Sequence, residues 1–258
     1  MKKSPAAVLF FTIRPKNAHL HVRMLRTFLC ACLFILLAAF PHPAVSSSSS
    51  TSSPSGELDP SAPALVLGAF IAVPPGPDIQ KMQSVQELWA TVLARHVPEK
   101  AFGNDIQSMP APVLVQWKNL SKRMPSWTAV EKLQNITGFF NRWDSIGDLE
   151  NYGAEEYWAI PEEFLEKGGG DCEDFAIIKY FALRYFGWPE QDLWILLGKD
   201  NKADRYHAVL AARTGEKIFI LDNLSRPSNL LLSDKQYTLS FTPLYAISEL
   251  GAWIFKEK

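Results

Sequence analysis

Cys172 and His207 are the residues of this sequence whose side chains could together perform nucleophilic catalysis. Cys172 opens a predicted helix that Asp171 caps, with Asp174 in the place of the reciprocal capping acid. A thiol at a helix N-terminus is activated, because the partial positive charge there favours the attacking thiolate. The backbone N–H of Cys172 also points toward the place where an oxyanion would form. His207 lies in a predicted strand that we expect to pack against this helix, so its imidazole is the candidate base.

A base of this kind needs a third residue to orient it, and the sequence offers Asp222 and Asn223. The choice depends on the loop between the strand of His207 and the next strand. A loop with an even number of residues, such as 213–216, pairs residue 212 with 217 and places His207 opposite Asp222. A loop of three, 214–216, presents Asn223 instead. We favour Asp222, but the register stays open at this point.

Acidic residues crowd Cys172 in the sequence Asp171-Cys172-Glu173-Asp174. Their negative charge should raise the pKa of the thiol and oppose the helix dipole. One interpretation is that they are solvated acids, which are common at helix starts. The other is that they bind a hard, oxygen-seeking cation such as Ca²⁺, with help from glycine carbonyls of 168–170. The Gly168-Gly169-Gly170 segment itself is expected to be a flexible approach to the helix.

The hydrophobic pattern predicts helices first and strands afterwards. Helical spacing of apolar residues marks four segments, 84–95, 112–120, 128–143 and 172–186, the last ending at Gly187 with Pro189 beyond it. Short apolar runs then predict strands at 193–197, 206–212 and 217–223, with further strands at 237–247 and 253–255. This order indicates an α+β fold, in which N-terminal helices are followed by an antiparallel sheet.

The N-terminus predicts export. Residues 1–46 combine basic residues, a short apolar run and small residues, as a signal peptide does, with Met24 as an alternative start. An uncleaved anchor is the other interpretation. Residues 47–79 are expected to be a Ser/Pro-rich linker, and 80–258 the folded domain. Cleavage would leave 20 basic and 27 acidic side chains, so nucleic acid is excluded as a partner. It would also leave Cys172 as the one cysteine.

Four segments resemble the bacterial transglutaminase-like cysteine proteinases, and among these the periplasmic adhesin proteases. They are Tyr157-Trp158-Ala159-Ile160-Pro161-Glu162-Glu163-Phe164-Leu165, Gly168-Gly169-Gly170-Asp171-Cys172-Glu173-Asp174-Phe175-Ala176, His207-Ala208-Val209-Leu210 and Leu221-Asp222-Asn223. The likeness spans about residues 80–255 and includes Asn135 and Phe139-Phe140-Asn141-Arg142.

The resemblance implies a papain-like, transglutaminase-type core with Cys172, His207 and Asp222 as the catalytic triad. It also implies calcium bound beside the nucleophile, with Asp171 and Glu173 as ligands. Proteases of this group cut large surface adhesins near the N-terminus, commonly within an alanine-rich site, and so release cells from biofilm. Some are inhibited by an inner-membrane cyclic-di-GMP receptor.

The sequence therefore predicts a periplasmic, calcium-dependent cysteine endopeptidase that acts on a large surface adhesin. Two alternatives remain. A transglutaminase or acyltransferase would use the same triad, Cys172, His207 and Asp222, with an amine in place of water. A calcium-binding periplasmic module without catalytic activity would keep Cys172 merely buried.

Overall fold

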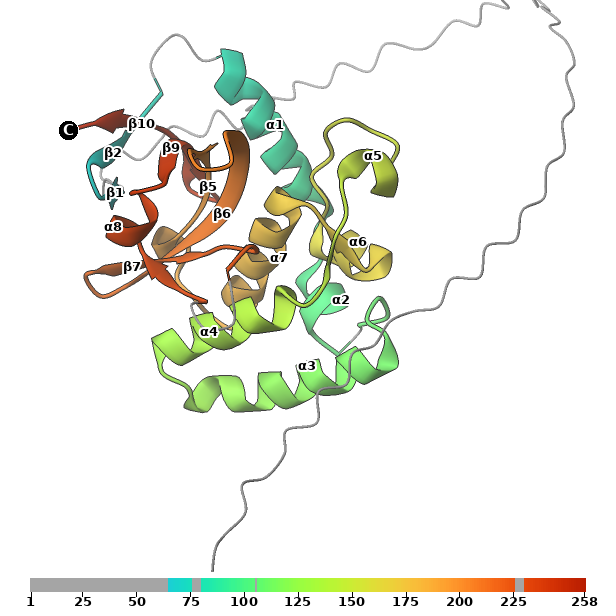
Figure 1. The fold of residues 1–258 in the computed structure, drawn as a ribbon. Coiled ribbons are helices and arrows are strands. Elements are labelled where there is room, and N and C mark those ends of the chain that lie inside the picture. The colour runs from blue at the N-terminus through green and yellow to red at the C-terminus, as the bar shows by residue number, and fades with distance from the viewer. Residues whose placement is uncertain (1–64, 76–79, 105, 226–229) are drawn as a thin grey trace, which may run out of the picture. The chain divides into compact units, whose positions relative to one another are not determined.

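The computed structural model describes residues 65–75, 80–104, 106–225 and 230–258 (Figure 1). The predicted signal peptide and the linker up to residue 64 lie outside them. The helices are α1 (Gln80–Arg95), α2 (Pro98–Phe102), α3 (Ala111–Arg123), η1 (Met124–Ser126), α4 (Ala129–Phe140), α5 (Asp148–Asn151), α6 (Pro161–Lys167), α7 (Cys172–Tyr185), η2 (Glu190–Asp192) and α8 (Asp234–Tyr237). The strands are β1 (Val66–Leu67), β2 (Phe70–Val73), β3 (Asp144–Ser145), β4 (Gly169–Gly170), β5 (Leu193–Asp200), β6 (Arg205–Thr214), β7 (Lys217–Leu221), β8 (Leu232–Ser233), β9 (Phe241–Ser248) and β10 (Gly251–Glu257).

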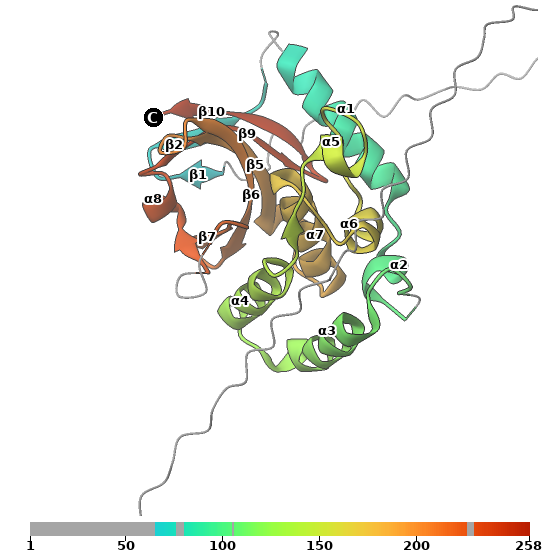
Figure 2. The same ribbon diagram turned by 45° about the vertical axis from the view of Figure 1, so that its right-hand side comes forward.

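Eight of these strands form one curved antiparallel sheet in the order β1-β2-β10-β9-β5-β6-β7-β8. The predicted α+β class is confirmed, since most helices precede the sheet in the chain. Figures 1 and 2 show α1, α4, α6 and α7 on one side of the sheet, with α7 packed directly behind β5 and β6. The remaining strands, β3 and β4, make a separate parallel pair.

Alternate residues of the central strands face two different cores, as the period of a β-strand requires. On β5, Leu193 and Ile195 pack with the helices, whereas Trp194 and Leu196 face the other side. The second side is covered by the β1–β2 hairpin and α8, which lie together there in both views of the ribbon (Figures 1 and 2). Asp234 accepts a hydrogen bond from the backbone N–H of Gly68 at 3.1 Å, which joins the two ends of the curved sheet.

The four predicted helices are present: α1 and α3 are longer than predicted, and α4 and α7 are shorter. The helix predicted at 84–95 is α1, that at 112–120 is α3, and that at 128–143 is α4, which begins after the cap Thr128. The strand predictions at 193–197, 206–212 and 217–223 correspond to β5, β6 and β7. Short elements such as α2, α5, α6 and α8 have too few residues to show a periodicity, so their sequences do not predict them.

The linker prediction is wrong for residues 65–73. These residues form β1 and β2, and β2 pairs with β10, so the folded domain begins before residue 80. Leu65 and Leu67 are buried against the second core. The Pro-rich composition around the hairpin concealed it, because each strand is too short for a clear alternation. Among the described residues, no helix combines the length and apolar character needed to cross a bilayer.

Replacing Leu67 tests whether the hairpin belongs to the domain. Leu67 is 1% exposed, and Leu67→Ala should lower the free energy of unfolding by about 2–5 kcal/mol because it leaves a cavity. Leu239, 86% exposed, is the matched control, and Leu239→Ala should change the value by less than about 0.5 kcal/mol. Chemical denaturation measures both. Equal stability of the two variants would show that the hairpin does not contribute to the fold.

Candidate active site

Cys172 is the first residue of α7, and the glycines before it are ordered rather than flexible. Gly168 ends α6 in the left-handed conformation, with φ of +85°. Gly169 has φ of +151° and, with Gly170, pairs with β3. A side chain on Gly170 would collide with the Asp174 carboxylate. The expected flexible approach is therefore wrong: Gly168 is needed for its left-handed φ, and Gly169 and Gly170 are needed because the backbone there is held closely against β3 and Asp174.

His207 on β6 and Asp222 after β7 form a buried pair. The His207 Nε2 lies 2.9 Å from the Asp222 Oδ1, and both side chains are almost fully enclosed. The loop between the strands is Gly215-Glu216, because Thr214 pairs with Lys217. The even-numbered loop is thus confirmed in parity, although it is shorter than the 213–216 loop considered from sequence. Asp222, not Asn223, is the partner of His207.

Asp222 is itself held from several directions. The Tyr237 hydroxyl donates to its Oδ2 at 2.9 Å, and the backbone N–H of Leu224 donates to its Oδ1 at 2.9 Å. The Asn141 side chain donates to its backbone carbonyl at 2.8 Å. Burial alone would raise the pKa of Asp222, but the hydrogen bond and charge of His207, with the other donors, bring it below the usual value. The carboxylate is therefore ionised and fixed in orientation.

Cys172 and His207 line the same pocket, which has a volume of about 300 Å³. Apolar residues make up much of its wall, and Trp158, Leu197 and Tyr245 are among them. Gly198 also lines it and pairs directly with His207 across β5 and β6. A side chain on Gly198 would collide with Phe241 and the backbone of Thr242, so only glycine fits opposite the histidine. Since Nε2 is engaged by Asp222, Nδ1 is the histidine nitrogen left for the thiol.

The thiol of Cys172 lies next to carboxylates. Its Sγ donates to the Glu173 Oε2 at 3.1 Å. Burial raises the pKa of Cys172 well above its usual value, and the charge and hydrogen bond of Glu173 raise it further, while the Ala208 backbone N–H lowers it. The helix dipole alone does not offset this, because it contributes only about 0.3–1 kcal/mol at exposed sites. The thiolate needs an additional positive charge nearby.

Asp171 gathers with Asp148 and Asp174 into a cluster of carboxylates beside Cys172. One oxygen from each lies within 4.8 Å of the others. The Oδ1 atoms of Asp148 and Asp171 are buried and have no hydrogen-bond partner among the described residues. Burial raises the pKa of Asp171 to about 9, helped by the charge of Glu173, and burial also raises the pKa of Asp148 and Asp174. Buried carboxylates in this arrangement are expected to bind a cation.

Of the two ligands predicted from sequence, Asp171 lies in this cluster and Glu173 lies at its border. The Glu173 carboxylate accepts from the Cys172 thiol at 3.1 Å, and its negative charge helps to raise the pKa of Asp171. Asp148 and Asp174 were not predicted as ligands. Asp174 has a local signal as the reciprocal capping acid, and it does accept from the Asp171 backbone N–H at 3.3 Å. No local sequence pattern marks Asp148 as a ligand. It reaches the cluster only because the pairing of β3 with β4 and the loop before α6 bring it there.

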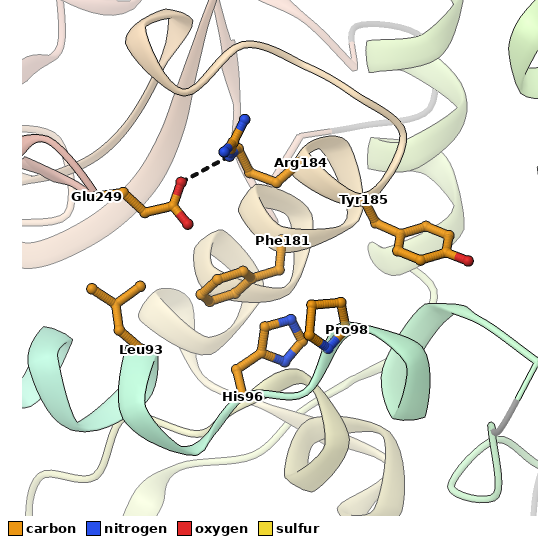
Figure 3. A pocket seen from close by; sticks show the side chains of 7 residues that line it. All are labelled: Leu93, His96, Pro98, Phe181, Arg184, Tyr185 and Glu249. Atoms are coloured by element: carbon orange, nitrogen blue, oxygen red, sulfur yellow. Dashed lines mark hydrogen bonds and ion pairs between the residues drawn. The ribbon is translucent and has the colours of Figure 1, made fainter.

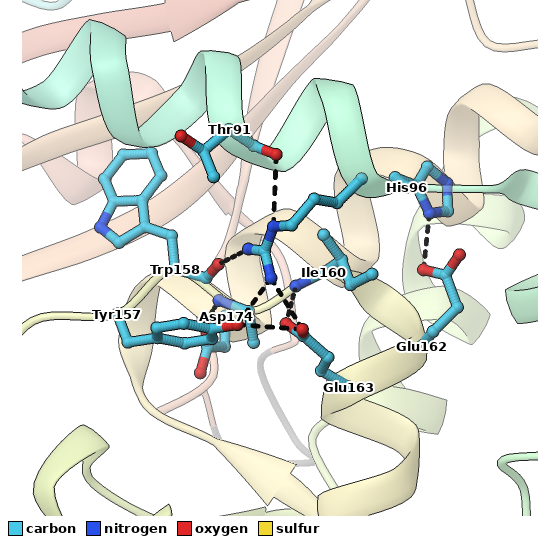
Figure 4. A network of polar contacts seen from close by, with 10 residues as sticks. Thr91, His96, Tyr157, Trp158, Ile160, Glu162, Glu163 and Asp174 are labelled. Carbon is cyan, nitrogen blue, oxygen red and sulfur yellow. Dashed lines mark hydrogen bonds and ion pairs between the residues drawn. The ribbon is translucent and has the colours of Figure 1, made fainter. Parts of the chain in front are cut away.

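A polar network fixes the loop that leads into α6 (Figure 4). Backbone N–H groups of Tyr157 and Ala159 donate to Asp148 and Asp174, at 2.6 and 2.8 Å. Arg95 at the end of α1 donates to the carbonyl of Trp158 at 2.7 Å and pairs with Glu163 at 2.7 Å. The carboxylate cluster and the pocket wall at Trp158 are therefore parts of one hydrogen-bonded unit.

A second pocket, of about 330 Å³, lies beside the C-terminal half of α7 (Figure 3). Phe181 and Arg184 of α7 line it with His96, and Arg184 is paired with Glu249 at 2.8 Å. His96 contacts Glu162 through Nδ1 at 2.8 Å. Among the described residues that line this pocket there is no cysteine, serine or threonine, so the thiol chemistry belongs to the pocket of Cys172.

The geometry can therefore support acyl transfer. A thiol at a helix N-terminus shares a pocket with a histidine, and a buried carboxylate orients that histidine. Tyr237 and Asn141 were not predicted as site residues. Tyr237 lies on the short helix α8 and gives no pattern, whereas Asn141 belongs to the stretch Phe139-Phe140-Asn141-Arg142 that carried part of the resemblance.

Comparison with known proteins gives a family and two similar structures. The family model of the bacterial transglutaminase-like cysteine proteinases matches residues 116–247. Calcium-bound LapG of Legionella pneumophila is 27% identical over 66% of this chain and 87% of that chain, with a TM-score of 0.49. The EGTA-treated form of the same protein is 29% identical over 66% and 84% of the two chains, with a TM-score of 0.48. No curated protein sequence matches the chain.

The carboxylate cluster predicts an unusual pH dependence for protein stripped of divalent cations. Burial raises the pKa of Asp171 to about 9 and that of Glu173 to about 7. The folded protein then keeps these protons up to about pH 7 and about pH 9, whereas the unfolded chain releases them above about pH 4. The free energy of unfolding therefore falls as the pH rises from about 4 to about 9. Thermal unfolding in chelator should give a higher midpoint at about pH 6 than at about pH 8.5.

Asp171→Asn is the matched control, and it should reduce this difference between the two pH values. A midpoint that rises with pH in the chelated wild-type protein would contradict the interpretation.

Proposed function

Because the chain belongs to the bacterial transglutaminase-like cysteine proteinases, we propose that it is an endopeptidase with Cys172 as nucleophile, His207 as base and Asp222 as the group that orients the base. The observation that carries the proposal is that Cys172 and His207 line one pocket while Asp222 engages the far nitrogen of the imidazole. A calcium-binding module without catalytic activity would not need this arrangement.

The reaction follows from the positions of these groups. The Cys172 thiol turns from Glu173 to His207, whose Nδ1 accepts the proton. The thiolate attacks a peptide carbonyl carbon and a tetrahedral oxyanion forms. The backbone N–H of Cys172, at the start of α7, donates to that oxyanion. The leaving amine takes the proton from His207, and water then hydrolyses the thioester with the same imidazole as base.

We further propose that Asp148, Asp171 and Asp174 hold Ca²⁺. Calcium takes six to eight oxygens at about 2.3–2.6 Å, so ligands on opposite sides of the ion lie about 5 Å apart. One oxygen from each of the three aspartates lies within 4.8 Å of the others, and the Oδ1 atoms of Asp148 and Asp171 are buried without a hydrogen-bond partner among the described residues. When bound, the cation would offset the negative potential of the carboxylates beside Cys172.

The proposed substrate and cellular location are based on the sequence. The predicted signal peptide supports the periplasm, and the resemblance of the segments around Trp158 and Cys172 extends to proteases that cut large surface adhesins. We propose that class of substrate, with cleavage near its N-terminus that releases cells from biofilm. An inner-membrane cyclic-di-GMP receptor is the proposed inhibitor.

The experiment that tests the function compares triad variants on a co-expressed adhesin N-terminus. Cys172→Ala and His207→Ala should each lower the cleavage rate by about 10⁴-fold or more, because the thiolate can no longer form or attack. Asp222→Asn should lower it too, because the amide cannot hold the required tautomer. Gel analysis of the cleaved fragment measures all three.

The control is Tyr206→Phe, since Tyr206 is 77% exposed at the rim of the pocket. Its rate should stay close to that of the wild type. Incorporation of a primary amine in place of hydrolysis would favour the transglutaminase alternative. Cleavage that survives Cys172→Ala would reject the nucleophile.

Calcium binding can be measured directly by titration calorimetry. Asp148→Asn should weaken binding by about tenfold or more, since it removes a charged ligand. Glu173→Gln should weaken it less, because Glu173 lies at the border of the cluster. Glu155→Gln, an exposed acid of the same loop, is the matched control and should bind as the wild type does. If Glu173→Gln weakened calcium binding more than Asp148→Asn did, the calcium site would lie at Glu173 and not at Asp148.

A further inference from the structure

The Asp222 carboxylate is held at both oxygens, and one of them has a single donor among the described residues. Its Oδ1 lies 2.9 Å from the His207 Nε2 and accepts from the backbone N–H of Leu224 at 2.9 Å. Its Oδ2 accepts from the Tyr237 hydroxyl alone, at 2.9 Å. Burial, and then the charge of Asp222, raise the pKa of Tyr237, so the hydroxyl keeps its proton and donates. The hydroxyl therefore fixes the rotation of the carboxylate that keeps Oδ1 toward the imidazole.

Tyr237 is the last residue of α8, and α8 is too short to hold it alone. The helix has four residues, and a single helical turn forms too few hydrogen bonds to offset the ordering of its backbone. Ser233 and Gln236 cap it by exchanging hydrogen bonds at 3.1 and 3.3 Å. This cap fixes the turn but not its place on the sheet. The position of the Tyr237 hydroxyl therefore depends on what packs against α8.

The β1–β2 hairpin packs against α8 through its turn. The backbone N–H of Gly68 donates to the Oδ2 of Asp234, the first residue of α8, at 3.1 Å. Gly68 has φ of +55°, and a side chain on it would collide with the hydroxyl of Thr238, directly after the helix. Both ends of α8 thus lie against the same turn. Figures 1 and 2 show the hairpin and α8 side by side.

The hairpin is itself anchored to the main sheet, so it can hold α8 in place. All four residues of β2 pair with β10. The Nζ of Lys258, directly after β10, donates to the Gly68 carbonyl at 2.9 Å. Leu65 and Leu67 are buried in the same core as Tyr237. The hairpin therefore joins α8 to the opposite edge of the curved sheet.

A segment outside the family region thus reaches the proposed triad through two hydrogen bonds and one helical turn. The family model matches residues 116–247, which include Tyr237 and Asp222 but not the β1–β2 hairpin. The first hydrogen bond joins Gly68 of the hairpin to Asp234. The second joins Tyr237, at the other end of α8, to Asp222.

We propose that Tyr237 is a positioning residue for His207, which it reaches through Asp222, and that the β1–β2 hairpin holds it in place. The proposal rests on the triad proposed above. Which nitrogen of a neutral histidine carries the proton is set by the hydrogen bonds of the ring. A carboxylate fixed at both oxygens keeps that proton on Nε2, so Nδ1 is free to accept the proton of Cys172. Tyr237 does not line the pocket of Cys172, so it acts on the reaction and not on substrate binding.

The first test replaces Tyr237 in the full, calcium-loaded protein. Tyr237→Phe removes the hydroxyl and keeps the ring. With a purified adhesin N-terminal fragment as substrate, kcat should fall by about tenfold, because a buried hydrogen bond to a charged group is lost. The KM should stay within about twofold of the wild-type value, because the pocket is unchanged.

A spectroscopic measurement on the same variant needs no substrate. In protein labelled with nitrogen-15 histidine, NMR shows which nitrogen of the neutral His207 ring carries the proton. The His207 signals are assigned by their absence in His207→Gln. The wild-type ring should carry the proton on Nε2, and the fraction in this form should fall in Tyr237→Phe.

The second test breaks the contact between the hairpin and α8. Asp234→Ala removes the acceptor for the Gly68 N–H, and it should lower kcat and the Nε2 fraction in the same direction as Tyr237→Phe. Asp234→Asn keeps an oxygen acceptor and should restore both values. Lys235→Ala, which removes an exposed side chain of the same helix, is the matched control and should leave kcat, KM and the Nε2 fraction unchanged.

The outcomes separate the two parts of the proposal. A folded Tyr237→Phe with wild-type kcat, or with its loss expressed in KM, would overturn the role of Tyr237. If Asp234→Ala behaves as Lys235→Ala does, or if Asp234→Asn behaves as Asp234→Ala does, the contact with the hairpin has no part in positioning His207.

Folding and function are checked independently of these outcomes. Thermal unfolding shows whether each variant is folded, and if Tyr237→Phe is not, the two Asp234 variants decide. If the wild-type protein cleaves no peptide bond, the proposed function fails, while the Nε2 fraction of His207 still tests the role of Tyr237.

Discussion

The carboxylate of Asp174 holds together the segments that make the site. It accepts from the backbone N–H groups of Ala159 and Asp171, which belong to the loop before α6 and to the start of α7. Gly170 must lack a side chain because this carboxylate occupies the space beside it. Asp174 is itself buried, and burial raises its pKa, so the interaction that organises the backbone also gathers negative charge next to Cys172. The need for a compensating cation follows from this one placement.

Cys172 lies between two buried charge systems of different composition. On one side, Asp148, Asp171 and Asp174 bring one carboxylate oxygen each within 4.8 Å of the others. On the other, the Asp222 carboxylate lies 2.9 Å from the His207 imidazole. Burial and the Glu173 carboxylate raise the pKa of the Cys172 thiol, so its surroundings on both sides must come to favour the thiolate before the thiol can ionise. The helix N-terminus contributes only about 0.3–1 kcal/mol at exposed sites.

The proposed triad could be predicted in part because Cys172 follows a capping aspartate, which is a local signal. The choice of Asp222 over Asn223 needed the β6–β7 register, in which Thr214 pairs with Lys217. The carboxylate cluster could be predicted only in part. Asp171 is local to Cys172, whereas Asp148 arrives through the parallel pairing of β3 with β4, which no periodicity encodes. The β1–β2 hairpin was missed for a related reason: its strands gain their stability from β10, near the opposite end of the chain.

The rotation of α7 couples the two charge systems. In a helix, residues two positions apart point to opposite sides, so Asp174 faces away from Cys172. Asp174 holds the loop before α6. A rotation of the first turn that relieved repulsion among the acids would therefore also turn Cys172 away from His207. A cation that fixes Asp171 and Asp174 fixes the direction of the thiol without touching the substrate. The proposed calcium site and the direction of the Cys172 thiol therefore depend on the same helix turn.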